Sequence, residues 1–181
     1  MKHLLNLLLL TVIICCQGYA SGISKWYVQR NAGNECVFFI FSKKIPALEN
    51  TKAIIKNLEY DFTYAQKNDS VAMLLTLKIK QPVKVQKISI MDGTVAISSV
   101  PEIIYVNSVG SKMKYRLRLM MSFEEFCKIF DSTNPYTLIL NLEDQKRYYD
   151  VMFGYNSKEW ADYSKKMRDI IELIKLNTGK K

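Results

Sequence analysis

The chain has 181 residues, of which 49% are hydrophobic and 24% are charged, and its 26 Lys and Arg against 17 Asp and Glu give a formal charge of +9. With only 7 Gly and 4 Pro, this is the composition of a globular protein of about one domain. It excludes a disordered tail, a collagen-like array and a polytopic membrane protein.

The first 20 residues have the pattern of a secretory signal peptide. Lys2 gives a short positive start, an apolar run follows, and small residues lead up to Ala20. The apolar run is shorter than the about 20 residues that span a bilayer. We therefore expect cleavage after Ala20 and a secreted or periplasmic mature chain, residues 21–181, that forms a single β-rich domain. A lipid anchor on Cys15 or Cys16 is the alternative.

Removal of this segment takes away His3, the one histidine of the chain. Without imidazole, Ser–His–Asp and Cys–His hydrolases and histidine-ligated zinc sites are excluded. Carboxylates such as Asp61, Asp92, Glu102 and Asp150 offer pairs for acid and base chemistry but form no motif. We therefore expect a non-catalytic protein without cofactor or metal. A carboxylate-dependent enzyme that acts on an envelope polymer is the alternative.

Two cysteines, Cys36 and Cys127, remain in the mature chain. In an oxidising compartment they could pair, and the long loop that they would close could stabilise the fold by about 4 to 5 kcal/mol. Both lie in apolar patterns, so two buried free thiols are the equal alternative.

Alternation of apolar and polar residues, the pattern of a half-buried strand, dominates from Lys25 onward. We expect strands at residues 26–29, 36–41, 58–64, 73–79, 103–106, 112–121, 136–142 and 147–153.

The strongest local signal is a β-hairpin around Asp92-Gly93, a pair that favours a two-residue turn. Such a turn places Ile90 opposite Val95 and Ile88 opposite Ile97, with all four side chains on one face.

Two helices interrupt the strands. Ser122 and Glu125 have the spacing of a capping box at the start of a short helix that ends near Phe130. An apolar stripe predicts a long final helix over residues 157–176. The order of elements predicts an α+β protein dominated by antiparallel β-sheet, either a sandwich or a curved sheet closed by the C-terminal helix.

A basic stripe is the candidate binding site. Alternation places the cations of residues 112–118 on one side of a strand, and the lysines of residues 78–87 follow a neighbouring strand. The candidate residues are Lys112, Lys114, Arg116, Arg118, Lys78 and Lys80. Such a face attracts an anionic ligand of the envelope or host surface, or an unknown protein, and we expect no nucleic-acid partner. The alternative is a solvated sheet face, on which lysines discourage aggregation.

The order of elements resembles the invasion-associated locus B family of small bacterial periplasmic proteins. The matching features are Trp26 soon after the signal, a strand that runs into Asp92-Gly93, a helix over 122–130, a strand pair, and the segment Asn156-Ser157-Lys158-Glu159-Trp160. The resemblance implies an envelope protein associated with host-cell entry, and the family has no known catalytic residues to carry over to this sequence. A structural subunit of an envelope assembly is a third interpretation.

Overall fold

The computed structural model describes most of the chain beyond the predicted signal segment. The described residues are 22–33, 35–46, 57–79, 82–91, 96–131, 137–142, 148–152 and 157–180. The predicted signal at residues 1–20, with Cys15 and Cys16, lies outside them, as do Lys80 and the Asp92-Gly93 turn. No helix among the described residues is long and apolar enough to cross a membrane.

Six antiparallel strands form the larger of two sheets, in the spatial order β1-β2-β3-β4-β8-β7. Their bounds are β1 Tyr27–Ala32, β2 Glu35–Pro46, β3 Asn57–Ala65, β4 Ser70–Ile79, β7 Glu102–Val109 and β8 Lys112–Ser122. Strand β8 therefore lies between β4 and β7, so a strand that comes late in the chain pairs with one from its first half.

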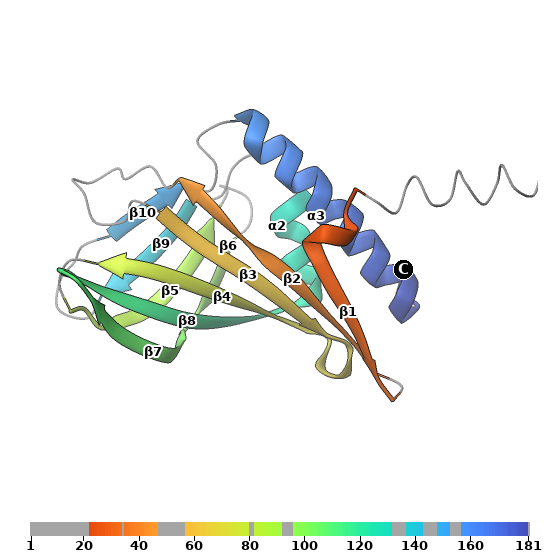
Figure 1. The fold of residues 1–181 in the computed structure, drawn as a ribbon, viewed down its shortest axis with the longest axis horizontal. Helices are drawn as coiled ribbons and strands as arrows, with labels where there is room; N and C mark the ends of the chain where they lie inside the picture. Colours follow the sequence, from red (N-terminus) through yellow and green to blue (C-terminus); the bar gives the residue numbers. More distant parts are fainter. Residues whose placement is uncertain are drawn as a thin grey trace, which may run out of the picture.

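Four strands form the smaller sheet, also antiparallel, in the order β10-β9-β5-β6. Their bounds are β5 Val85–Met91, β6 Ala96–Ser99, β9 Thr137–Leu142 and β10 Tyr148–Met152. Together with the two helices, these sheets confirm the predicted α+β fold dominated by antiparallel sheet (Figure 1).

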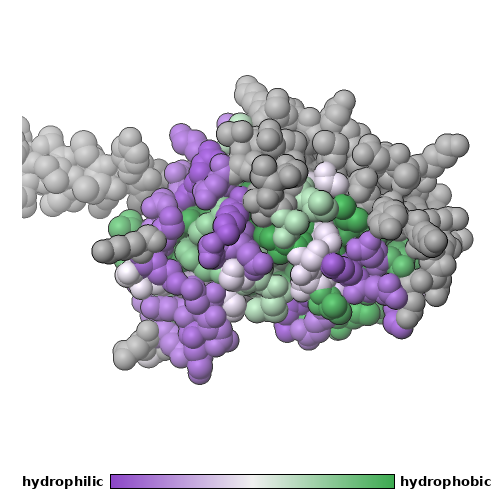
Figure 2. Space-filling view, turned by 180° about the vertical axis from the view of Figure 1, so that it is seen from behind, coloured by the Kyte–Doolittle hydropathy of each residue, from purple (hydrophilic) through white to green (hydrophobic). Residues whose placement is uncertain are grey.

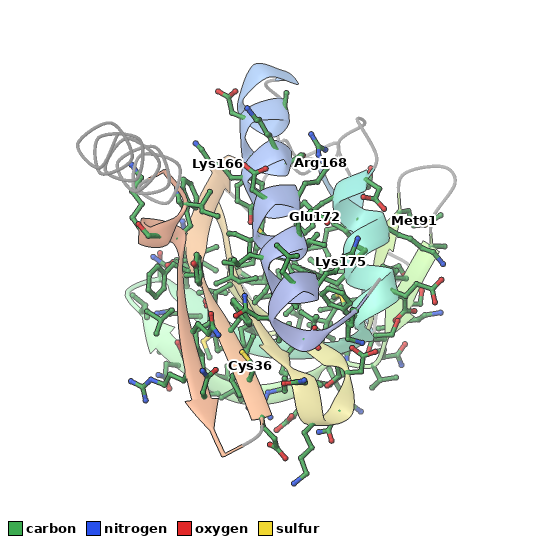
Figure 3. All side chains as sticks on the ribbon, turned by 90° about the vertical axis from the view of Figure 1, so that its right-hand side faces the viewer. Cys36, Met91, Lys166, Arg168, Glu172 and Lys175 are labelled. Carbon is green, nitrogen blue, oxygen red and sulfur yellow. The ribbon has the colours of Figure 1, made fainter. Side chains whose placement is uncertain are left out.

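The two helices are α2, Phe123–Asp131, and α3, Ser157–Thr178. The capping box at the start of α2 is confirmed, because Glu125 N–H donates to Ser122 Oγ at 3.1 Å and Ser122 N–H donates to the Glu125 carboxylate at 2.8 Å. Both helices lie on the same side of β1 and β2 (Figure 3). Two short 3-10 helices, η1 Ser24–Trp26 and η2 Gln66–Asn68, complete the fold, so Trp26 precedes the first strand instead of belonging to it.

Alternation divides the larger sheet into an inner face and an outer face. On the inner face, buried side chains of β2, β3, β4 and β8 join those of the smaller sheet, α2 and α3 in one hydrophobic cluster. Aromatic rings make up much of the cluster: Phe62 lies 4.9 Å from Phe126, and Tyr64 lies 4.9 Å from Phe123, between ring centroids. The outer face is the side of this sheet that carries neither helix.

The predicted register of the β5–β6 hairpin is wrong. Ile90 lies opposite Ile97, and Ile88 lies opposite Ser99, so four residues, 92–95, separate the paired strands instead of two. The difference is a shift by two residues, which leaves every side chain on the same face of the sheet. Ile90 and Ile97 are both buried, as in the predicted register. The hydrophobic pattern therefore did not distinguish the two registers.

Candidate functional site

Strand β8 presents the predicted basic stripe on the outer face of the larger sheet. Tyr115 and Leu117 point into the core, while the side chains between them are half-buried. The four cations of the stripe, Lys112, Lys114, Arg116 and Arg118, therefore share one face, as predicted.

Lys78 joins this stripe from the neighbouring strand. In the antiparallel pairing of β4 with β8, Lys78 lies directly opposite Lys114. Side chains that lie opposite each other in a sheet have Cβ atoms only about 5 Å apart, and like charges in such a pair are destabilising. The structure thus brings Lys78 into the stripe, whereas Lys87 lies on β5 of the smaller sheet.

The two arginines of the stripe are bound within the protein. Arg116 forms an ion pair with Asp61 of β3 and donates to Thr76 Oγ1 at 2.7 Å. Only 19% of the Arg116 side chain and 21% of the Asp61 side chain are exposed. Arg118 forms an ion pair with Glu102 of β7 at 2.9 Å in a more exposed setting.

Three lysines are left to face a ligand. Within the described residues, Lys78, Lys112 and Lys114 form no ion pair; we call these three the lysine patch. The Nζ atom of Lys114 lies 5.8 Å from the centroid of the Tyr105 ring, so this side chain leans from β8 toward β7. Lys114 therefore directs its positive charge toward the β7 edge of the sheet.

The structure describes the side chains of two of the carboxylates named above, Asp61 and Glu102. Asp61, Leu74, Arg118 and Glu102 lie opposite one another in successive strands, so three strand spacings separate the two acids. That separation is about 14 Å between backbones. Both acids are also held by arginines. Asp92 and the side chain of Asp150 lie outside the described residues.

Cys36 and Cys127 are both free thiols in this structure. Cys36 is buried on β2 opposite Asn31, and Cys127 is half-buried on α2. Burial raises the pKa of Cys36 above its ordinary value, and it raises the pKa of Cys127 to about 11. Neither thiol has the lowered pKa of an activated nucleophile.

Two further features of the described residues concern metal binding and the distribution of apolar surface. Among the described residues, no group of three or more His, Cys, Asp and Glu side chains has the arrangement to hold a metal ion. Seen from behind Figure 1, apolar residues gather near the middle of the surface, with hydrophilic residues beside them (Figure 2). The lysine patch belongs to the outer face of the larger sheet, which the helices do not cover.

Comparison with protein-family models, with curated proteins and with solved structures finds no match.

Sequence reasoning missed two participants at this surface, Asp61 as the partner of Arg116 and Tyr105 as the neighbour of Lys114. The sequence marks Asp61 only as a candidate for acid and base chemistry. Tyr105 lies in a strand that the sequence predicted, but its proximity to the stripe follows from the pairing of β7 with β8.

Proposed function

We propose that the protein is a non-catalytic secreted or periplasmic protein that binds an anionic partner on the outer face of its larger sheet, through Lys78, Lys112 and Lys114. The observation that carries this proposal is the direct opposition of Lys78 and Lys114. Like charges on directly opposite residues of a sheet are destabilising, and a bound anion relieves their repulsion. Arg116 and Arg118 already form ion pairs with carboxylates of neighbouring strands. We therefore assign these arginines to the stability of the sheet and not to the binding of the ligand.

The test compares two variants that lose the same three charges. One replaces Lys78, Lys112 and Lys114 with glutamine; the matched control replaces three exposed lysines elsewhere, Lys25, Lys87 and Lys165. We expect the first variant to elute from a heparin column at clearly lower salt than the wild type and the control to change much less, because the effect depends on position and not on net charge. Equal losses in both variants, or wild-type retention that does not depend on salt, would contradict the proposal.

The location outside the cytoplasm is proposed from the signal pattern and from the resemblance to the invasion-associated locus B family, which also favours a role in contact with host cells. The intact mass of the protein recovered from its native compartment tests it. We expect a chain that begins at Ser21. A chain that retains Cys15 or Cys16 with acyl groups would establish a lipid anchor instead, and a chain that retains His3 would contradict export with cleavage.

A further inference from the structure

Strand β7 is an edge of the larger sheet, with no further strand beside it in the part of the chain that the structure describes. It is the last strand in the spatial order, and seven of its eight residues are exposed. Several of them are apolar: Ile103 is 46% exposed, Val106 39% and Val109 47%. A long edge strand with apolar side chains and unpaired backbone groups is a site where another strand can add.

The backbone of β7 has hydrogen-bonding groups that point away from the sheet. Val109 lies opposite Lys112 across the two-residue turn Gly110-Ser111, and Gly110 has a φ of +60°. The residues that flank a turn of this kind form a hydrogen-bonded pair. Because such pairs alternate along antiparallel strands, Val109 and Asn107 face β8, whereas Ser108 and Val106 turn their N–H and C=O groups outward.

The side chains next to this edge differ between its two faces. On the outer face, Lys114 leans over Tyr105, and Lys112 lies opposite Val109. On the inner face, Ile103 and Val106 lie opposite Leu117 and Tyr115, at the margin of the core. A strand added beside β7 would lie about 10 Å from β8, a distance that a lysine and a glutamate side chain can bridge together.

We propose that the partner contributes an extended acidic segment that adds to β7 as a seventh strand, with carboxylates on the outer face toward Lys112 and Lys114 and apolar side chains beside Ile103 and Val106. This inference rests on the proposed function and names the class of its ligand, an alternating acidic and apolar peptide. Its backbone binds the outward groups of β7, and the lysine patch selects its charge.

A second copy of this chain fits the same edge less well. Two copies joined through β7 would place both lysine patches on one continuous sheet face, and the formal charge of +9 on each chain would add to the repulsion. An acidic segment has the complementary charge.

The experiment uses a fluorescently labelled ten-residue peptide of alternating Glu and Val, with an alternating Lys and Val peptide as the charge control, in fluorescence anisotropy titrations. Ser108→Pro removes an outward N–H that β8 does not use, and Ser108→Ala keeps it. We expect the acidic peptide to bind the wild type and Ser108→Ala within twofold of each other, and to bind Ser108→Pro at least tenfold more weakly. The basic peptide should not bind. Circular dichroism checks that each variant is folded.

The outcomes separate this inference from the proposed function. Equal binding of the acidic peptide to Ser108→Pro and to the wild type would overturn strand addition, while lysine-dependent retention on heparin would still support the anionic surface. A wild-type dimer that Ser108→Pro converts to a monomer, without peptide binding, would overturn the proposal in favour of a second copy. Val106→Pro removes the other outward N–H. Binding of the acidic peptide to Val106→Pro at wild-type affinity would also contradict strand addition at β7.

Discussion

The two edges of the larger sheet differ in how they are closed. At one edge, β1 and the residue before it contact α3. The centroid of the Trp26 ring lies 6.2 Å from that of Tyr163 and 4.9 Å from Lys166 Nζ. Within β1, the Gln29 side-chain amide donates to Asn177 Oδ1 at 3.2 Å. At the other edge, β7 makes its contacts with β8 and leaves nearly all of its residues exposed.

Among the described residues, the fold therefore anchors the β1 edge to a helix and gives the β7 edge no such anchor. Edge strands are commonly protected by charge, bulges or a covering element. Strand β1 has a central charge, Arg30, and a helix beside it. Strand β7 has a register shift near Ile104 but carries no lysine or arginine. An accessible apolar edge next to a basic surface is therefore the feature of this molecule that most needs a functional explanation.

The largest expected effect is at the closed edge. Trp26→Ala removes the ring that packs against Tyr163 and leaves a cavity between η1 and α3. Because Trp26 is only partly buried, we expect a loss of about 2 kcal/mol in the free energy of unfolding, below the range for fully buried aromatic residues. Urea denaturation followed by circular dichroism measures it.

Ile103→Ala is the corresponding truncation at the β7 edge. We expect the free energy of unfolding to fall by no more than about 0.5 kcal/mol, because this exposed side chain has little packing to lose. A loss at Ile103 as large as that at Trp26 would contradict the comparison, since it would show that β7 is as much a part of the core as η1 and β1.

The two arginine ion pairs sharpen the same contrast with a smaller effect. Arg116→Gln leaves the largely buried Asp61 without its cation, and we expect a loss of about 1 to 2 kcal/mol. Arg118→Gln breaks the exposed pair with Glu102 that joins β8 to β7, and we expect a loss within about 0.5 kcal/mol. Thermal or urea unfolding of both variants measures these losses in the free energy of unfolding. Equal losses would show that the β7 edge is held as firmly as the interior of the sheet.

The local pattern of the sequence predicted most of the fold. Alternation identified the inner and outer residues of β8, and the spacing of Ser122 and Glu125 identified the start of α2. Both features depend on residues close together in the chain, where side-chain period and backbone geometry are directly linked.

The rest could not be predicted because it depends on which strands become neighbours. Asp61 reaches Arg116 only because β4 lies between β3 and β8, and β7 lies at an edge only because it pairs with β8 on the side away from β4. Alternation assigns a residue to a face of a strand but does not specify the neighbours of that strand. The candidate stripe was thus predictable as a set of residues, while its internal ion pairs and its position beside an edge were not.

The two thiols lie in different parts of the fold, Cys36 on β2 beside β1 and Cys127 on α2, so their alkylation rates can be compared. Thiolate is the form that iodoacetamide alkylates. With a pKa of about 11, Cys127 is about one-thousandth thiolate at pH 8, so its alkylation rate should rise about tenfold per pH unit up to pH 10. The rate rises with pH because the raised pKa keeps the Cys127 thiol protonated in the folded protein until the pH approaches that value. Peptide mass spectrometry follows each cysteine separately.

At Cys36, burial of the side chain limits alkylation in addition to the raised pKa of the thiol. It is buried opposite Asn31 of β1, and its N–H donates to the Gln66 side chain at 2.9 Å, so alkylation requires the elements packed around it to open. If the contacts of Trp26 hold the β1 edge closed, Trp26→Ala should accelerate alkylation of Cys36 several-fold at pH 8 and leave Cys127 nearly unchanged. Ile103→Ala should change neither rate. An unchanged rate at Cys36 in Trp26→Ala would mean that pairing with β2 alone keeps β1 in place, and the two edges would then differ in exposure but not in strength.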